Sequence, residues 1–170
     1  DVDPGDFDGR PYNSYNVIPD ALMVNFQAVN FMFRPDVAGN RVEITADPLP
    51  SNLRVRNQVQ LIDGRCGGSG NSINFTVESL GGRDEATFTG RFSRQCAEYR
   101  VTRSLMKAPE YAYGVFRALW EESGGSIGGG FRHAVAPATG MQVLATLDSV
   151  PLTDVITGIN KYSNNVMARH

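Results

Sequence analysis

Apolar residues recur at every second position through most of the first 100 residues, in short runs separated by Gly, Pro, Asn and Asp. This period of two is typical of β-strands with one buried face. It predicts strands over residues 22–26, 29–33, 41–46, 53–62, 73–77, 86–92 and 97–102. We expect a tight turn at 27–28 between the first two strands. In the fourth strand, 53–62, the alternation of apolar and polar residues slips out of phase near Asn57.

The period changes to that of a helix after these strands. Tyr113, Phe116, Leu119 and Trp120 are spaced as on one helix, which we expect over 109–123. Further strands are predicted over 131–136 and 141–147, then a helix over 151–161 and the first turn of another over 166–170. The predicted class is α+β, with a mostly antiparallel sheet packed by a helix.

Composition excludes two classes of protein. The chain of 170 residues has 16 cationic and 18 acidic side chains, a formal net charge of −2. An ordinary nucleic-acid binder needs a cationic face for phosphate contacts. No apolar run approaches the ~20 residues of a membrane span. Lys107 and Lys161 are the two lysines, so lysine-based chemistry has two candidates.

The two cysteines, Cys66 and Cys96, match no Cys-x-x-Cys metal or redox spacing. Each lies beside a predicted strand end, so they form either a disulfide or two buried free thiols. A disulfide closing this loop would stabilise the fold by roughly 3–4 kcal/mol in the chain-entropy model. It would also indicate an oxidising compartment such as the periplasm.

Two segments resemble ligand-binding loops but fail their patterns. The acidic segment 1–9 has Gly5 and Asp6 where a calcium loop needs a ligand and a glycine, so we expect a solvated loop. The glycine-rich segment 124–130 follows a helix and contains no lysine, unlike a phosphate loop, and is expected to be a helix C-terminal turn. The sequence predicts no metal and no cofactor.

Ser104-Leu105-Met106-Lys107 spells the S-x-x-K of serine acyl enzymes. In those enzymes the two side chains lie one helical turn apart, so that the amine can take the hydroxyl proton. Pro109 follows two residues after Lys107 and disfavours a helix that starts at Ser104 and continues through this point. We therefore expect a strand end that leads to the helix at 109–123.

A second candidate is Lys161-Tyr162-Ser163-Asn164-Asn165, a polar turn between two predicted helices. Such a turn can present a hydroxyl and a carboxamide to one cleft. A Ser-x-Asn string is common in protein sequences and indicates little by itself. Its position between two predicted helices makes it a better candidate for a functional site.

Several stretches together resemble one family, the D-alanyl-D-alanine carboxypeptidase/endopeptidases of the class C low-molecular-mass penicillin-binding proteins. The stretches are 8–13, the two cysteines flanking the 75–92 hairpin, 108–111, and 149–152 leading to 161–165. The resemblance covers the whole chain, and the last stretch is the most specific.

The resemblance implies a periplasmic serine hydrolase that cleaves peptidoglycan stem peptides through an acyl-enzyme and is acylated by β-lactams. Three motifs build that site: S-x-x-K, S-x-N and K-T-G. Ser163 and Asn165 carry over to the middle motif, with Asn164 where the family commonly has Asp. The Ser163 hydroxyl would relay a proton, and the Asn165 carboxamide would hold the substrate carbonyl.

The family's chain order implies a division of this sequence. Residues 1–19 would be the tail of an inner insert domain, 20–130 an outer insert domain, and 131–170 the return to a partial transpeptidase/β-lactamase-like lobe. The nucleophile would precede Asp1 and K-T-G would follow His170. We therefore expect a fragment that is inactive alone and that exposes an apolar face in its last ~40 residues.

Two alternatives stay open at this point. One is a stand-alone acyl enzyme with Ser104 as nucleophile, Lys107 as base and Ser163 as relay. The other is a non-catalytic module that binds the cell wall or gives structural support. Acylation of Ser104 by penicillin would support the first, and peptidoglycan binding without turnover would support the second.

Overall fold

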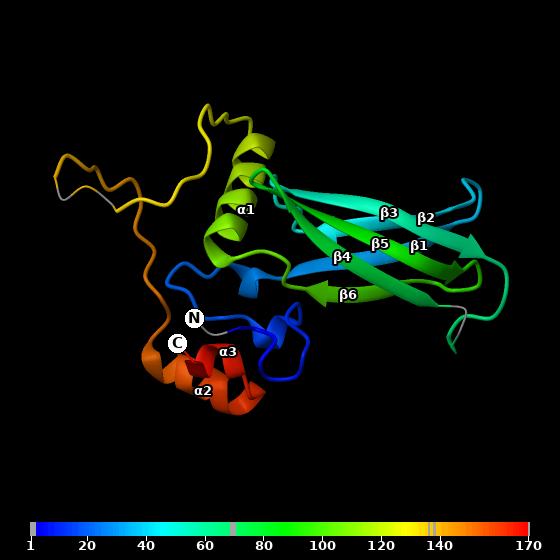
Figure 1. Cartoon of the computed structure of the whole chain (residues 1–170). Helices are drawn as coiled ribbons and strands as arrows, with labels where there is room; N and C mark the ends of the chain where they lie inside the picture. The colour runs from blue at the N-terminus through cyan, green and yellow to red at the C-terminus, as the bar shows by residue number, and fades with distance from the viewer. Residues whose placement is uncertain (1–2, 69–70, 136, 138, 170) are drawn as a thin grey trace.

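The computed structural model describes residues 3–68, 71–135, 137 and 139–169. Two short 3-10 helices come before six strands and three α-helices, and Figure 1 shows their arrangement. The elements are η1 (Ser14–Asn16), η2 (Asn25–Gln27), β1 (Val29–Asp36), β2 (Arg41–Asp47), β3 (Leu53–Ile62), β4 (Ser72–Leu80), β5 (Arg83–Ser93), β6 (Tyr99–Arg103), α1 (Ala108–Glu122), α2 (Leu152–Tyr162) and α3 (Asn165–Arg169).

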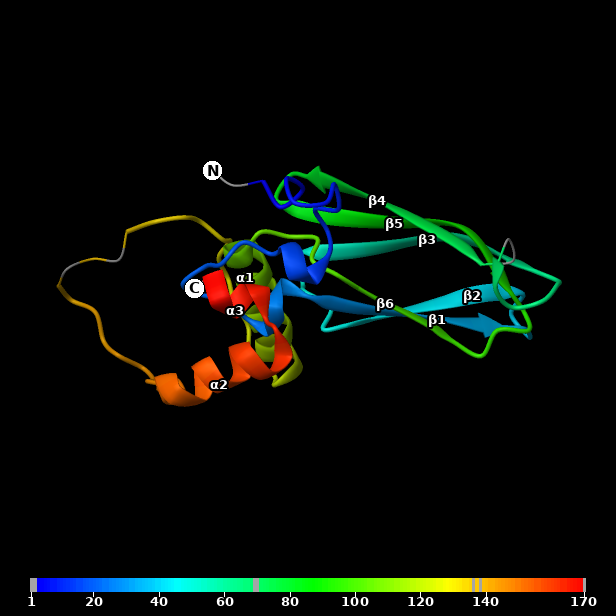
Figure 2. The ribbon, with the colours of Figure 1, turned by 90° about the horizontal axis from the view of Figure 1, so that it is seen from below.

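The strands form two three-stranded sheets that lie face to face, as the two layers of Figure 2 show. One sheet has the order β2-β1-β6 and is antiparallel throughout. The other has the order β3-β5-β4, with β4 antiparallel to β5 and β3 parallel to it. The predicted α+β class with mostly antiparallel pairing is confirmed.

The core between the sheets is aromatic. Phe31 and Phe33 alternate with exposed or half-buried residues along β1, and both are fully buried. Their rings lie 4.8 and 5.2 Å from the ring of Phe88 in β5. Burial of a phenylalanine contributes about 1.5–3 kcal/mol, so this cluster is a large part of what joins the sheets.

The phase slip predicted near Asn57 in β3 has a structural cause. The Asn57 Nδ2 donates a hydrogen bond of 2.6 Å to the Val42 carbonyl of the other sheet. Its Oδ1 accepts a 3.0 Å bond from the Val59 backbone N–H. Asn57 is exposed but shares a strand face with Val55 and Val59, and a polar side chain is accepted there because both its oxygen and its nitrogen are paired.

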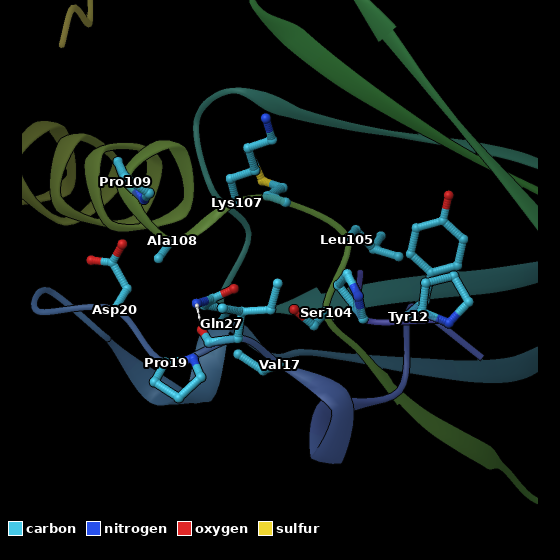
Figure 3. A pocket seen from close by; sticks show the side chains of 14 residues that line it. Tyr12, Val17, Pro19, Asp20, Gln27, Ser104, Leu105, Lys107, Ala108 and Pro109 are labelled. Atoms are coloured by element: carbon cyan, nitrogen blue, oxygen red, sulfur yellow. Dashed lines mark hydrogen bonds between the residues drawn. The ribbon is translucent and has the colours of Figure 1, made fainter. Parts of the chain in front are cut away.

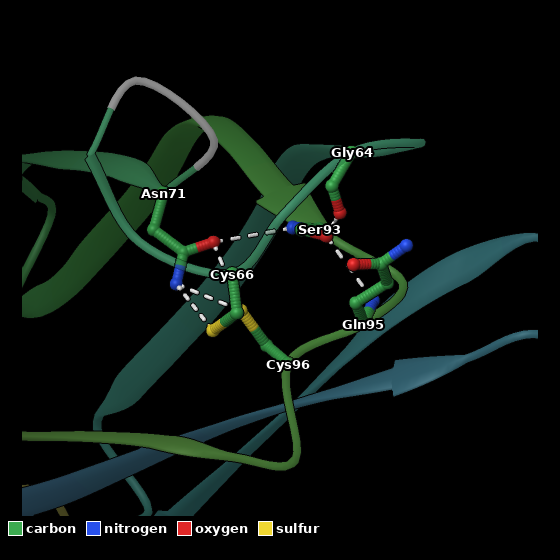
Figure 4. The surroundings of a disulfide bond; sticks show 6 residues. All are labelled: Gly64, Cys66, Asn71, Ser93, Gln95 and Cys96. Carbon is green, nitrogen blue, oxygen red and sulfur yellow. Dashed lines mark hydrogen bonds between the residues drawn. A yellow bond between two sulfur atoms is a disulfide. The ribbon is translucent and has the colours of Figure 1, made fainter.

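Cys66 and Cys96 form a disulfide, which resolves the choice left open by their spacing. The bond ties the loop after β3 to the segment after β5, and Figure 4 shows its surroundings. The Asn71 Nδ2 lies 2.9 Å from the Cys96 Sγ, and the Asn71 Oδ1 accepts from the Ser93 N–H at 3.2 Å. One asparagine thus connects the start of β4, the end of β5 and the disulfide.

Helix α1 lies across one end of the two sheets (Figures 1 and 2). Its buried residues are Ala108, Tyr111, Ala112, Gly114 and Val115, rather than Phe116, Leu119 and Trp120, whose spacing predicted the helix. A residue without a side chain is needed at Gly114 because the loop before β3 approaches closely there. A Cβ at Gly114 would lie 1.8 Å from the Asn52 Oδ1. The aromatic side chains Phe116 and Trp120 are instead 58% and 47% exposed.

The glycine-rich segment after α1 is the helix C-terminal turn that we expected. Gly124 has φ +88°, and its N–H donates to the Glu121 carbonyl. The Gly125 N–H donates to the Trp120 carbonyl. This pair of bonds is the Schellman motif, which ends the helix.

Three predicted strands are wrong in the described residues. Residues 22–26 do not form a strand, because Asn25, Phe26 and Gln27 have φ of 46°, 50° and 53° and turn the chain into β1. Residues 131–136, of which 136 lies outside the described part, and 141–147 are not strands either, since no strand pairs with them.

Both of these segments leave apolar side chains exposed. Val135, Leu144 and Leu147 are 95%, 91% and 97% exposed. This confirms the expected apolar face in the last ~40 residues. The predicted helices that follow are also confirmed, as α2 and α3. No helix among the described residues is both long and apolar enough to cross a membrane.

We predict that Phe88→Ala lowers the free energy of unfolding by about 3–5 kcal/mol, because it removes the ring shared by both sheets. The matched control is Phe7→Ala, whose side chain is 74% exposed and which should change stability by less than about 0.5 kcal/mol. Denaturant unfolding of both variants measures the difference. Equal effects of the two substitutions would contradict the aromatic core described above.

Candidate functional site

Ser163 lies in the turn between α2 and α3 in a left-handed conformation, with φ 49° and ψ 44°. The N–H of Asn164 donates to the Ile159 carbonyl, so Ser163 occupies the position that glycine usually takes at a helix end. The side chain of Ser163 is exposed and has no hydrogen-bond partner among the described residues. Its hydroxyl is free to bind a ligand.

The next residue begins α3. The Asn164 Oδ1 accepts a 3.0 Å hydrogen bond from the Met167 N–H, which makes Asn164 the side-chain cap of that helix. Asn and Asp cap helices about equally well, so the variation at the middle position of the motif keeps the turn. Asn165 is the first residue of α3, and its side chain lies outside the described part of the structure.

The turn opens on a cavity of about 380 Å³. Its walls are η1, the chain from η2 into β1, which is close to η1 in sequence, and the distant α2–α3 turn, with Thr102 of β6 adjoining. The lining residues are Ser14, Tyr15, Asn25, Phe26, Ala28, Asn30, Thr102, Tyr162, Ser163, Asn164 and Val166. The sequence motif therefore lies at an open, shallow cavity.

A hydrogen-bonded carboxylate holds the η1 wall. The Asp8 Oδ2 accepts from the Tyr15 hydroxyl at 2.7 Å, and its Oδ1 accepts from the Asn16 Nδ2 at 2.7 Å. The Tyr15 hydrogen bond is the largest cause that lowers the pKa of Asp8 below the ordinary value of 3.8. Asp8 thus connects one of the stretches that carry the family resemblance to the cavity.

The wall from η2 includes two residues in left-handed backbone conformations, Asn25 and Phe26. The Asn25 Nδ2 donates to the Ala28 carbonyl at 2.9 Å, which also accepts from the buried Tyr111 hydroxyl at 2.7 Å. These bonds hold Phe26 at the cavity, with 43% of its surface exposed. Left-handed backbone costs an ordinary residue roughly 1–2 kcal/mol, so strained residues concentrate at this cavity.

Sequence analysis missed Tyr15, Asn25 and Phe26 as cavity residues. Asn25 could have indicated the turn that brings these residues to the cavity, because asparagine is among the non-glycine residues that best tolerate a left-handed backbone. The alternation of Leu22, Val24 and Phe26 concealed it by imitating a strand.

Ser104 and Lys107 do not form a catalytic pair. The segment follows β6 without helical structure, and the Ser104 N–H donates to the Tyr12 carbonyl at 2.9 Å. Figure 3 shows the Lys107 amine directed away from the Ser104 hydroxyl, although both residues line one cavity of about 590 Å³. An activating base must lie within hydrogen-bond distance of its nucleophile, so the stand-alone acyl enzyme is not favoured.

No three His, Cys, Asp or Glu side chains of the described residues lie together as a metal site. In the acidic N-terminal segment, the Asp3 Oδ1 accepts from the Gly5 N–H, and Asp8 is engaged as described above. His133 is in an extended loop rather than a strand, and its Nε2 lies 3.4 Å from the Glu110 Oε1.

We predict that Ser163→Gly raises stability by up to about 1 kcal/mol, whereas Ser163→Ala leaves it nearly unchanged, because alanine keeps the Cβ that serine already carries. Glycine accepts φ 49° without a Cβ penalty, and alanine does not. Thermal unfolding of the two variants provides the test. If alanine were as stable as glycine, Ser163 would not occupy a left-handed helix end.

The hydrogen bonds of Asp8 should fail at low pH. Because its pKa is lowered by folding, its contribution to stability is present above the unfolded value of 3.8 and is lost as the pH falls through the lower folded pKa. NMR signals of the Asn16 side-chain amide should therefore shift as the pH is lowered below about 3.8. An Asp8→Asn variant lacks the titrating group, and the same shift in that variant would contradict the assignment.

Two solved structures are similar in fold to this chain. One is the crystal structure of penicillin binding protein 4 (dacB) from Haemophilus influenzae complexed with a novel beta-lactam, with a TM-score of 0.61, 20% identity, and coverage of 88% of this chain and 33% of that one. The other is a crystal structure of penicillin binding protein 4 (dacB) from Haemophilus influenzae, with a TM-score of 0.63, 19% identity, and coverage of 92% of this chain and 34% of that one. No curated protein matches the chain.

The chain spans about a third of the length of those structures. At this identity the similarity shows a shared fold. The family is shown by a separate comparison of sequence, in which the profile of the D-Ala-D-Ala carboxypeptidase 3 (S13) family matches residues 4–170. The match covers nearly the whole chain, both the strands and the α2–α3 turn, and the chain therefore belongs to the D-Ala-D-Ala carboxypeptidase 3 (S13) family.

Proposed function

We propose that this chain is part of a serine-type D-Ala-D-Ala carboxypeptidase/endopeptidase that hydrolyses peptidoglycan stem peptides through an acyl-enzyme and is acylated by β-lactams. One observation carries the proposal. The free hydroxyl of Ser163 lies in a strained turn, at an open cavity lined by η1, the chain from η2 into β1, and the α2–α3 turn. Membership of the family supports the same reaction.

In the proposed reaction a nucleophilic serine attacks the carbonyl carbon of the scissile D-Ala–D-Ala bond. The carbon–nitrogen bond breaks, and the leaving amine takes a proton that the Ser163 hydroxyl relays from the nucleophile and its lysine. Water then hydrolyses the ester and restores the serine. The Asn165 carboxamide holds the substrate's amide carbonyl in register during both steps.

The nucleophile and the K-T-G motif of this proposal belong to parts of the protein other than these 170 residues. The sequence contains no Lys-Thr-Gly string, and Ser104 lacks an adjacent base. The chain spans about a third of the similar structures, which leaves room for both motifs. In this division residues 1–19 end an inner insert domain, 20–130 form an outer insert domain, and 131–170 return to the catalytic domain.

The same proposal places the protein in the periplasm. Disulfides persist in oxidising compartments and are rare where glutathione keeps thiols reduced. Both cysteines of the chain, Cys66 and Cys96, are joined in a disulfide, and this oxidised state supports the periplasmic location.

We predict that the 170-residue chain, incubated with a fluorescent penicillin, keeps its unmodified intact mass, because loss of the nucleophile removes acylation. A longer protein that includes this chain and the family's S-x-x-K should gain one adduct. A stoichiometric adduct on the 170-residue chain that disappears in Ser104→Ala would contradict the proposal.

In that longer protein, Ser163→Gly should lower the rate of D-Ala release by about 10²–10⁴-fold, the usual effect of losing a proton-transfer group. Glycine preserves the turn, so lost activity reports the hydroxyl. The matched control is Ser123→Gly, which removes the serine at the end of α1, outside the Ser163 cavity. Equal rates for the two variants would exclude Ser163 as the relay.

A further inference from the structure

A larger cavity, of about 880 Å³, borders α1 and shares no lining residue with the Ser163 cavity. Its walls are the tip of the β4–β5 hairpin, the loop before β3, one side of α1 and residues 130–133. The hairpin tip is a two-residue turn at Gly81 and Gly82, both with positive φ, as type I′ turns require. This turn places Arg83 at the cavity.

Two arginines of this cavity have no partner. Arg83 and Arg132 make no ion pair or side-chain hydrogen bond within the described residues, and both are exposed. The third arginine, Arg117, is engaged, because its Nε lies 2.7 Å from the Glu121 Oε1 and its Nη1 donates to the Tyr113 hydroxyl. A free guanidinium is a strong donor for a carboxylate, which it can bind through two parallel hydrogen bonds.

Aromatic rings stand beside these cations. The ring of Phe131 lies 5.4 Å from Tyr113 of α1 and 4.9 Å from His133. The Tyr113 hydroxyl donates to the Gly129 carbonyl at 3.3 Å, which holds residues 129–133 against α1. A ring wall of this kind provides apolar contact for a peptide or for the C–H face of a sugar.

Glu110 supplies an acceptor. Its Oε1 faces the His133 ring, while its Oε2 is buried and has no hydrogen-bond partner among the described atoms. Buried polar atoms are nearly always paired, so an unpaired carboxylate oxygen beside a cavity indicates a missing donor. Because this oxygen is closed to solvent, an N–H or O–H group of a ligand fills that role only once the Glu110 side chain turns toward the cavity.

We propose that this cavity binds a carboxylate-bearing component of peptidoglycan without breaking any bond. Arg83 and Arg132 receive the carboxylate, Glu110 accepts an N–H or O–H, and Phe131 contacts the intervening apolar atoms. The inference rests on the proposed function only in naming peptidoglycan as the source. The carboxylate comes either from a stem peptide or, in strands whose stem peptide has been removed, from the lactyl group of muramic acid.

The test is an NMR titration of the ¹⁵N-labelled 170-residue chain with N-acetyl-D-alanyl-D-alanine and, separately, with N-acetylmuramic acid. Each acid is compared with its carboxamide. We expect at least one acid to shift amide signals of residues 81–83, 110–117 and 129–133, and its carboxamide to bind about tenfold more weakly or worse. A response to the peptide alone identifies the stem peptide as the source, and a response to the sugar alone identifies the lactyl group.

The double variant Arg83→Gln/Arg132→Gln should also weaken binding by about tenfold or more. The control is Arg65→Gln/Arg91→Gln, which removes the same charge at two exposed arginines that do not line this cavity. All four side chains are exposed, so both variants should keep the dispersion of the native spectrum. Equal weakening by both variants would overturn the proposal.

Two further results would also overturn it. One is the absence of shifts at this cavity with both acids. The other is a response confined to residues 162–166, which would leave the proposed function intact because it would place the ligand at the Ser163 cavity.

Discussion

Contact between Phe88 and the facing rings of Phe31 and Phe33 joins the two sheets, and the candidate site depends on that contact. Packing on Phe88 fixes the position of β1. The chain that enters β1 is then held by the Tyr111 hydroxyl, which donates to the Ala28 carbonyl from α1. One aromatic cluster therefore determines the position of the η2 wall of the Ser163 cavity.

The remaining walls are attached to this core by polar contacts. The Asp8 carboxylate holds η1 through Tyr15 and Asn16, and the Ser104 N–H binds the Tyr12 carbonyl nearby. Helix α3 contacts η1, and Val166 of α3 is buried. The turn with Ser163 consequently lies against segments that are more than 100 residues away in sequence.

Local patterns predicted most of the elements and failed where the deciding contact is distant. Alternation identified the strands of both sheets, and helical spacing with a glycine stop identified α1. Alternation alone also predicted a strand over 22–26, because side-chain order does not reveal the left-handed backbone of Asn25 and Phe26. The parallel pairing of β3 with β5 joins strands that are not consecutive, and no short-range pattern encodes it.

The candidate site was predictable to a similar extent. The S-x-N spacing between two helices predicted Ser163 as a site residue, a role that stays a prediction, and the structure places it at a cavity. The Pro109 argument predicted that no helix starts at Ser104, and residues 104–107 are not helical. The cavity around Ser163 was not predictable, since Tyr15 and Phe26 reach it only through tertiary contacts. The unpaired Arg83 and Arg132 likewise carry no sequence signal, because pairing of a surface arginine depends on which acidic side chains the fold brings near.

The central claim is that the Ser163 hydroxyl acts in proton transfer at an acylated serine. The most direct measurement is a crystal structure of the longer protein, including this chain, after acylation by a penicillin. The account predicts the Ser163 Oγ within about 2.6–3.2 Å of the acylated serine oxygen, of its neighbouring lysine amine or of the opened lactam nitrogen. A Ser163 hydroxyl directed away from the adduct, with none of these atoms within hydrogen-bond distance, would contradict it.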